Sequence, residues 1–272
     1  MIPLSKQHYQ KLIEPLKEVK FNNLFARFVV EGQVSGKVYV DNELNPETFY
    51  VVHPYGMSLL FGKFNNKSFN DCFYDYALNK NKIRNQIEWM QAFPNDWDNV
   101  LIKLFGKNLV RSSDSISGQI ELNTRVNFAF NRDLYNQVRQ SISSIPYTIE
   151  RTNKESYNVM KGSVIPAKFW DCADDFLNKG VDFSLFHNGK LASTAYSAFI
   201  FDELLELGIE TVEEFRGKGL ARYACFALID YCLENGYEPI WSCRLENIGS
   251  YNLAKKLGFE PTLQIPFYKI SV

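Results

Sequence analysis

Residues 209–221 read IETVEEFRGKGLA, and this stretch decides the fold that we expect. An apolar run ends at Val212, two glycines follow in a short loop, and a long apolar-periodic segment begins at Leu220. The pattern predicts a strand that enters a helix through a loop whose backbone N–H groups point outward. Unpaired N–H groups at a helix start, together with the helix dipole, make an anion-binding site.

The composition of this loop favours a di- or polyphosphate as the anion. Gly217 and Gly219 lack a Cβ atom, so a phosphate can approach the backbone closely. Positive charge comes from Arg216, Lys218 and Arg222. A Walker loop needs Ser or Thr where Gly219 stands, and a dinucleotide fingerprint needs Gly or Ala where Arg222 stands. The alternative interpretation of the loop is a glycine-capped turn with a solvated basic rim.

A second informative segment, residues 241–261, reads WSCRLENIGSYNLAKKLGFEP. It predicts the end of a strand followed by a helix over 247–257. Asn247 is a suitable residue to cap the helix start, and Gly258 is a suitable residue just beyond its end. Taken alone, this segment indicates only a well-capped helix.

Together the two segments resemble the GNAT N-acetyltransferase superfamily. Residues 216–221 (RGKGLA) match its pyrophosphate loop, Q/R-x-x-G-x-G/A, and residues 247–259 match its later asparagine–helix–KLGF segment. The resemblance covers roughly residues 124–270. The extended first half, with Trp241, Cys243 and the AKKLGF ending, is similar to a two-domain branch that includes zwittermicin-resistance acetyltransferases.

The resemblance implies acetyl-CoA as the co-substrate. Backbone amides of residues 217–222 are expected to hold the pyrophosphate, and strand 204–212 is expected to diverge from strand 239–244 to admit pantetheine. Backbone groups near Thr211 and Val212 are expected to pair with the pantetheine arm and to polarise the thioester carbonyl. The full set of residues expected to bind acetyl-CoA is Thr211, Val212, Arg216, Gly217, Lys218, Gly219, Leu220, Ala221, Arg222, Asn247 and Ser250.

Acetyl transfer to an amine also needs a proton acceptor, because a free alkylamine has a pKa of about 10 and must be neutral to attack. We predict that Glu210 is this base, since it stands next to the strand–loop junction where the acetyl group is expected. Glu206 lies on the same face of the same strand and is the rival candidate. The alternative for both residues is a solvated carboxylate. The resemblance makes Asn247 the second catalytic candidate.

The general acid is left open by one departure from the family. Many members have a tyrosine seven residues after the asparagine, where this chain has Ala254. Tyr251 stands on the same helix, one turn earlier, and is not the aligned residue. A thiolate with a pKa of about 8–9 can also leave without a dedicated acid.

The rest of the chain predicts an α/β protein of two domains. Residues 120–272 are expected to form a GNAT-like domain with a mixed, mostly antiparallel sheet flanked by helices. Residues 1–115 are expected to form an additional α/β domain that is degenerate or shapes the acceptor site, with the boundary in the polar stretch 111–119 (RSSDSISGQ). Helices are expected over 6–19, 68–79, 81–92, 96–106, 131–142, 166–179, 219–235 and 247–257. Strands are expected over 24–40, 47–62, 124–130, 146–151, 182–188, 191–202, 204–212, 239–244 and 264–270.

The composition excludes several other classes of protein. With 272 residues and a net charge of -1, the chain lacks the basic excess of a nucleic-acid-binding protein. Neither a membrane-spanning run nor a signal peptide is recognisable, so we expect a cytoplasmic protein that does not bind membranes. The five cysteines and three histidines lack metal-ligand spacing, so neither a metal site nor a disulfide is expected.

The sequence therefore predicts an acetyl-CoA-dependent N-acetyltransferase that acts on a primary amine of a small molecule by direct transfer. The alternative is a non-catalytic acyl-CoA-binding or interaction module that keeps the fold. A third option is an N-acyltransferase that uses aminoacyl or longer acyl donors. The oligomeric state is left open between a monomer and a homodimer.

Overall fold

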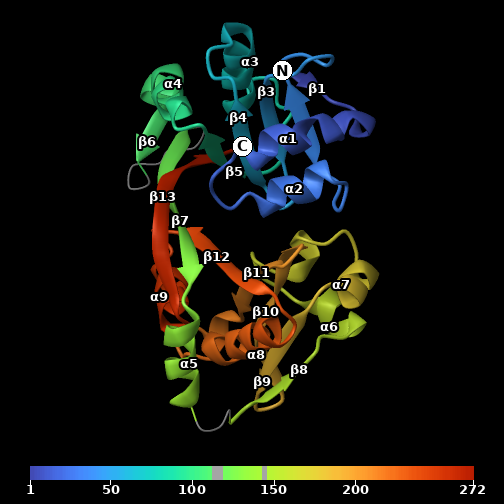
Figure 1. The fold of residues 1–272 in the computed structure, drawn as a ribbon, viewed down its shortest axis with the longest axis vertical. Coiled ribbons are helices and arrows are strands. Elements are labelled where there is room, and N and C mark those ends of the chain that lie inside the picture. The colour runs from blue at the N-terminus through green and yellow to red at the C-terminus, as the bar shows by residue number, and fades with distance from the viewer. Residues whose placement is uncertain (112–118, 143–145) are drawn as a thin grey trace. The chain divides into compact units, whose positions relative to one another are not determined.

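The computed structural model describes residues 1–111, 119–142 and 146–272, which form two compact units (Figure 1). Unit 1 comprises Met1–Val126, Arg244–Glu246 and Leu263–Val272, and unit 2 comprises Asn127–Cys243 and Asn247–Thr262. Most of the predicted boundary at 111–119 lies outside the described residues. Both units are mixed α/β structures with mostly antiparallel sheets flanked by helices, which confirms the predicted fold class.

The sheet of unit 1 has the strand order β1-β2-β3-β4-β5-β13. Its neighbours are antiparallel except for β4 and β5, which are parallel. The strands are β1 (Ile2–Pro3), β2 (Lys37–Val40), β3 (Thr48–Val52), β4 (Met57–Gly62), β5 (Glu88–Phe93), β6 (Leu109–Arg111), the first part of β7 (Ile120–Phe130) and the last part of β13 (Phe259–Ile270). The helical segments are η1 (Lys6–Leu12), α1 (Ile13–Lys17), α2 (Leu24–Val30), α3 (Lys67–Ala77), α4 (Asp96–Phe105) and η2 (Gly106–Asn108).

Two predictions for unit 1 are wrong. The expected strand over 24–40 contains a helix, α2, and only β2 of that range is a strand. Six of the seven residues of α2 are buried, so its apolar run has no polar face to reveal a helical period. The expected helix over 81–92 is wrong as well, because residues from Glu88 onward form β5 and pair with β4. In that case long-range pairing overrides the local pattern.

The sheet of unit 2 has the strand order β12-β11-β10-β9-β8. Its neighbours are antiparallel except for β11 and β12, which are parallel. The strands are β8 (Thr148–Glu150), β9 (Asp182–His187), β10 (Lys190–Phe201), β11 (Leu204–Thr211), β12 (Glu238–Arg244) and parts of β7 and β13. The helical segments are α5 (Arg132–Gln140), α6 (Lys154–Val159), η4 (Pro166–Lys168), α7 (Ala173–Lys179), η5 (Glu213–Phe215), α8 (Ala221–Glu234) and α9 (Ile248–Lys256).

The predicted order of elements in unit 2 is confirmed in large part, but the helix α6 was not predicted. The three successive strands β9, β10 and β11 are present, and the tight turn between the first two has Asn188 and Gly189 at positive φ. The single helix expected over 166–179 is instead divided into η4 and α7. Cys172 has an extended backbone and caps the second segment, which separates the two helical stretches.

Helix α8 places the predicted anion site at one end of this sheet. Its buried residues pack against β9, β10 and β11, and two of them are Cys225 and Cys232, whose thiols are free. Because only a short loop with the 3₁₀ turn η5 separates α8 from β11 in the chain, the helix start lies near the strand end. The long helix and its loop are therefore fixed by the core, as the sequence predicts.

Both units contain a strand, a helix and a parallel strand in the same order. In unit 1 this is β4, α3 and β5, and the strands pair at five positions from Met57–Trp89 to Phe61–Phe93. In unit 2 it is β11, α8 and β12, and the strands pair at only three positions, ending at Glu206–Ile240. The two strands thus stay paired in unit 1 and separate in unit 2.

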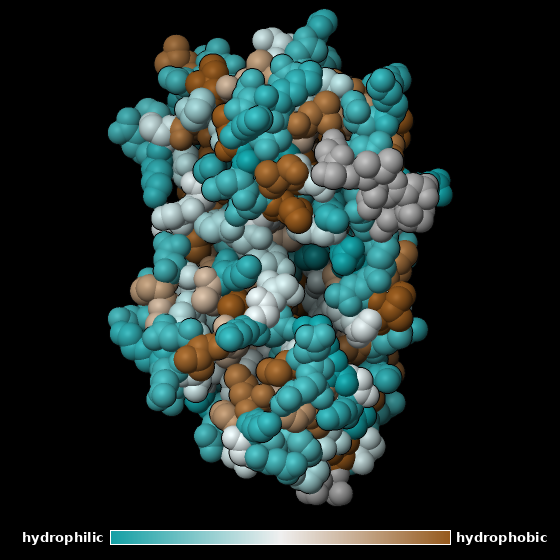
Figure 2. Space-filling model, turned by 180° about the vertical axis from the view of Figure 1, so that it is seen from behind, coloured by the Kyte–Doolittle hydropathy of each residue, from teal (hydrophilic) through white to brown (hydrophobic). Residues whose placement is uncertain are grey.

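The face drawn in Figure 2 is mostly hydrophilic, with apolar side chains scattered among polar ones. Such isolated apolar residues are usual on protein surfaces. No helix in the described parts of the chain combines the length and the apolar character that crossing a bilayer requires.

Arg84 provides a test of how unit 1 is held together. It is 4% exposed, and its side chain donates hydrogen bonds to five backbone carbonyls, those of Tyr76 (3.0 Å), Ala77 (2.9 Å), Gln86 (3.4 Å), Ile270 (3.0 Å) and Ser271 (2.6 Å). We expect Arg84→Leu to lower the free energy of unfolding by about 3 kcal/mol, because it leaves buried acceptors without donors. Urea unfolding measures this change.

The matched control is Lys80→Ala, since Lys80 forms an exposed ion pair with Asp75. This variant should change the free energy of unfolding by less than about 0.5 kcal/mol. Equal effects of the two substitutions would contradict a structural role for the Arg84 guanidinium.

Candidate active site

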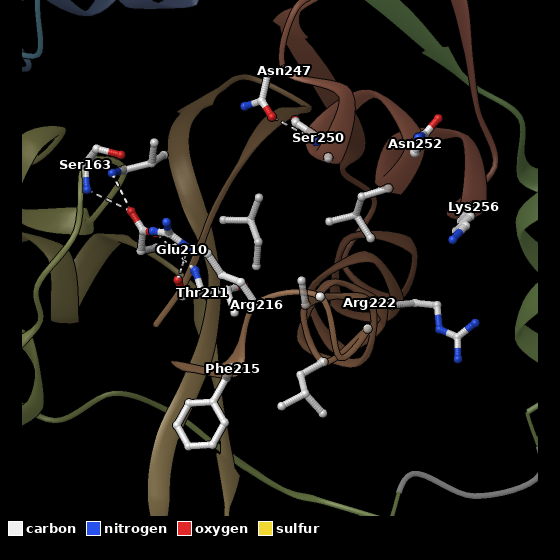
Figure 3. A pocket seen from close by; sticks show the side chains of 18 residues that line it. Ser163, Glu210, Thr211, Phe215, Arg216, Arg222, Asn247, Ser250, Asn252 and Lys256 are labelled. Carbon is white, nitrogen blue, oxygen red and sulfur yellow. Dashed lines mark hydrogen bonds and ion pairs between the residues drawn. The ribbon is translucent and has the colours of Figure 1, made fainter. Parts of the chain in front are cut away.

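Unit 2 contains a cavity of about 710 Å³ at the point where β11 ends (Figure 3). Its walls are the end of β11, the loop that leads into α8, the first turn of α8, one face of α9 and residues 163–164. The pairing of β11 with β12 stops at Glu206, so the strand beyond that residue has an open edge. An open backbone edge beside a cavity offers N–H and C=O groups to a ligand.

The glycine pair in the loop has the geometry of an anion cradle. Gly217 and Gly219 have φ angles of +77° and +74°, which a residue with a side chain rarely adopts. No atom lies within 4 Å of the position that a Cβ would take at either residue. The loop backbone therefore has free space in front of it, next to the start of α8.

The three basic residues of the loop have different surroundings. Arg216 Nε donates to the carbonyl of Thr211 (3.0 Å), and its Nη2 donates to Glu210 Oε1 (3.1 Å). Lys218 Nζ lies 5.1 Å from the centre of the Phe215 ring. The guanidinium of Arg222 lies over the Tyr223 ring at 5.0 Å. Arg216 and Arg222 line the cavity.

Most of the residues expected to bind acetyl-CoA lie together at this cavity. Nine of the eleven are in its walls: Thr211, Arg216, Gly217, Gly219, Leu220, Ala221, Arg222, Asn247 and Ser250. Val212 and Lys218 are outside the lining. The N–H of Val212 donates to the carbonyl of Ala192 on β10 (3.0 Å), so it points away from the open edge of β11.

Glu210 is 8% exposed, and hydrogen-bond donors surround its carboxylate (Figure 3). Its Oε2 accepts from the backbone N–H groups of Ser163 (2.8 Å) and Val164 (2.9 Å). Its Oε1 accepts from the N–H of Thr211 (3.2 Å) and from Arg216 Nη2 (3.1 Å). Each oxygen thus already accepts two hydrogen bonds, which fills the usual capacity of a carboxylate.

Glu210 also explains a glycine that sequence reasoning did not single out. A Cβ atom on Gly162 would overlap the Glu210 carboxylate. Residues 162–164 are therefore held closely against the end of β11. These residues carry no recognisable motif, and their contact with Glu210 spans 46 and 47 positions in the sequence. Only the folded chain brings them to the cavity.

Glu206 lies two strand positions before Gly208 and four before Glu210, on the same face of β11. It is 6% exposed and is the last residue of β11 that pairs with β12. A Cβ atom on Gly208 would overlap the ring of Tyr196, so this ring covers the face between the two glutamates. Glu206 is therefore located where the two parallel strands begin to separate.

Asn247 caps α9, as the sequence predicts, by accepting a hydrogen bond from the N–H of Ser250 (3.2 Å). The hydroxyl of Ser250 accepts from Trp241 Nε1 (3.3 Å). The helix then presents Gly249, Asn252, Leu253 and Lys256 to the cavity, at spacings of three and four residues. Sequence reasoning missed Asn252 and Lys256, although their spacing from Gly249 gave a usable signal.

Neither Tyr251 nor Ala254, which stands where the resemblance expects a tyrosine, lines the cavity. Ala254 is fully buried in α9. The ring of Tyr251 packs against Phe128 at 5.5 Å, and Lys255 Nζ lies 5.9 Å from its centre. None of the described residues in the cavity wall is a tyrosine. In the described ranges, no group of three or more His, Cys, Asp or Glu side chains could hold a metal ion.

Comparison with known proteins now identifies the family. A family model described as GNAT acetyltransferase matches residues 14–268, which include parts of both units. The chain belongs to the GNAT acetyltransferase family. This confirms the resemblance noted in the sequence and supports an acyltransferase activity.

Relatives of this GNAT chain match it over nearly its full length. YdfB of Bacillus subtilis (strain 168), described as an uncharacterized N-acetyltransferase, is 25% identical over 267 residues, 97% of each chain. A GCN5-related N-acetyltransferase-like protein from Streptococcus suis has a TM-score of 0.70 and 18% identity, covering 97% of this chain and 98% of that one. A tandem GNAT protein from the clavulanic acid biosynthesis pathway has a TM-score of 0.61 and 10% identity, covering 98% and 97%.

The hydrogen bonds around Glu210 lead to a test of its structural role. We expect Glu210→Ala to speed hydrogen exchange at the amides of Ser163 and Val164 and to lower the free energy of unfolding by about 2 kcal/mol, because buried donors lose their acceptor. Hydrogen exchange followed by mass spectrometry measures the first effect. Glu213→Ala removes an exposed carboxylate from the same loop and serves as the control. Unchanged exchange at residues 163–164 in Glu210→Ala would show that the carboxylate does not hold them.

Proposed function

We propose that unit 2 binds acetyl-CoA in this cavity and transfers its acetyl group to a primary amine of a small molecule. The observation that carries the proposal is the open glycine loop at the start of α8, beside the end of β11 that no longer pairs with β12. Family membership supports the same chemistry. The amides of residues 217–222 would hold the pyrophosphate, and the open edge of β11 would hold the pantetheine arm.

The hydrogen bonds of β11 show which backbone groups could receive that arm. The N–H of Val212 points to β10, and successive residues of a strand point to opposite edges. Thr211 and Ile209 therefore face the open edge. The N–H of Thr211 donates to Glu210 and its carbonyl accepts from Arg216, so Ile209 is the better candidate for pairing with pantetheine.

The role of the base is best assigned by comparing the two glutamates. Glu210 already accepts four hydrogen bonds, so a proton from the amine would displace one of its donors. We propose that Glu210, which lines the cavity, accepts the proton and gives up one of these donors when it does. Glu206 is not among the described residues that line the cavity and is the rival candidate. Direct attack of the amine on the thioester carbonyl then releases the CoA thiolate, and the proton lost by the amine passes to the carboxylate of Glu210.

The two glutamates can be separated by matched substitutions to Gln. We expect Glu210→Gln to lower turnover at neutral pH by about 10²–10⁴-fold with a smaller change in the dissociation constant of acetyl-CoA, as loss of a general base should. Glu206→Gln should leave turnover nearly unchanged, because Glu206 is not among the described residues of the cavity wall. Rates across pH, measured with a panel of amines, test both. The opposite result would support Glu206 as the base.

The amine panel also separates this proposal from a non-catalytic acyl-CoA-binding module. An enzyme releases CoA thiol when a suitable amine is added. A module binds acetyl-CoA and releases none with any amine.

The glycine loop is tested by two substitutions of equal backbone cost. Gly219 and Gly236 have φ angles of +74° and +77°, and each has open space where a Cβ would be placed. We expect both changes to Ala to cost about 1–2 kcal/mol of stability, from the left-handed backbone. Only Gly219→Ala should weaken acetyl-CoA binding, by at least about tenfold, because its methyl group would meet the pyrophosphate. Calorimetry measures the dissociation constants. Equal binding by the two variants would rule out the loop as the pyrophosphate site.

A further inference from the structure

The cavity in unit 2 continues past the glycine loop to a second group of polar side chains. Figure 3 shows Arg222, Asn252 and Lys256 on the side opposite Glu210 and Ser163. Arg222 comes from the first turn of α8, and the other two come from the last two turns of α9. Two helices thus place two cations and an amide at one end of the cavity.

Among the described ion pairs, neither Arg222 nor Lys256 has a carboxylate partner, whereas six other basic residues of unit 2 do. These six are Arg139, Arg151, Lys154, Lys179, Lys190 and Arg216. In the described structure, the guanidinium of Arg222 instead lies over the Tyr223 ring, and its Nη2 donates to the Tyr223 hydroxyl (3.2 Å). Its Nε is buried without a hydrogen-bond partner in the described structure. A buried donor without an acceptor is costly, and a turn of the guanidinium toward an anion in the cavity would relieve that cost.

The position of Arg222, Asn252 and Lys256 in the cavity indicates which kind of anion would suit them. The glycine loop, with its backbone N–H donors, lies between this group and Glu210. A diphosphate bound at the loop would therefore leave Arg222, Asn252 and Lys256 available for a second anionic group. A guanidinium fork, an ammonium and an amide N–H₂ group are the donors that suit the oxygens of a phosphate monoester. Such a group carries a charge of about −1.5 to −2 at neutral pH.

We propose that Arg222, Asn252 and Lys256 form a subsite for the 3′-phosphate of CoA and thereby select free CoA thioesters as donors. The inference rests on the proposed function, because it assumes that the glycine loop holds the diphosphate. A donor that carries only a phosphopantetheine arm, such as an acylated carrier protein, lacks this phosphate. It would leave Arg222 Nε unpartnered and gain nothing from Lys256.

The test compares the binding of CoA with that of 3′-dephospho-CoA by calorimetry. We expect the wild-type protein to bind CoA at least about tenfold more tightly, as charge-assisted hydrogen bonds of this kind allow. Lys256→Ala should reduce this ratio by about three- to tenfold and leave the affinity for 3′-dephospho-CoA nearly unchanged. Arg222→Lys should also reduce the ratio, because an ammonium cannot reproduce the fork.

Lys255→Ala provides the matched control, since Lys255 is the adjacent residue on α9, is also exposed and lies over Tyr251 outside the cavity. It should leave the ratio unchanged. Equal affinity of the wild-type protein for the two ligands would overturn the subsite while leaving the proposed function intact. Equal effects of Lys255→Ala and Lys256→Ala on the ratio of the two affinities would also overturn the subsite. Failure of both ligands to bind the folded protein would contradict the proposed function itself.

Discussion

Three residue pairs join β11 to β12, and the rest of the site depends on the pairing ending at Glu206 and Ile240. Unpaired backbone groups inside a sheet need other partners, because an orphaned N–H or C=O group is costly when buried. A ligand inserted between the strands can supply them. Helix α8 begins beside this gap, so its N-terminal N–H groups and the glycine loop face the same space. A closed sheet would leave the loop without a cavity in front of it.

The comparison of the two units shows that this gap is a property of particular residues and not of the strand–helix–strand arrangement. In unit 1, β4 and β5 pair at five positions, and the indole of Trp97 donates to the carbonyl of Gly62 at the end of β4 (3.2 Å). The segment between β4 and α3 has the sequence KFNN and no glycine. Unit 1 therefore keeps the order of elements but not the features that form the site.

The parts of the site that consist of neighbouring residues could be predicted from the sequence. The loop at 216–221 and the helix cap at Asn247 depend on neighbouring residues, so their patterns survive in a single sequence. The setting of Glu210 could not be predicted, because its partners Ser163 and Val164 are separated from it by 47 and 46 positions and act through backbone N–H groups. A sequence records no signal for a backbone donor.

The two wrong predictions of secondary structure in unit 1 also arise because the sequence shows only local patterns. The apolar run of α2 is buried on nearly all sides, and such a run has the same composition whether it is a helix or a strand. Strand β5 is defined by its pairing with β4, and the polar residues before it favoured a helix only locally. Lys256 differs, because its spacing of seven residues from Gly249 placed it on the cavity face of α9 in a way that the sequence already contained.

The contact between acetyl-CoA and the chain is the feature of the proposed site that can be located most directly. Hydrogen exchange of the whole protein, measured with and without saturating acetyl-CoA, locates that contact without any substitution. We predict slower exchange at the amides of residues 217–222 and along Ile209–Thr211, with no change at residues 63–66 of unit 1. Unchanged exchange at residues 217–222 in a folded, saturated protein would contradict the account, and so would equal protection of residues 63–66.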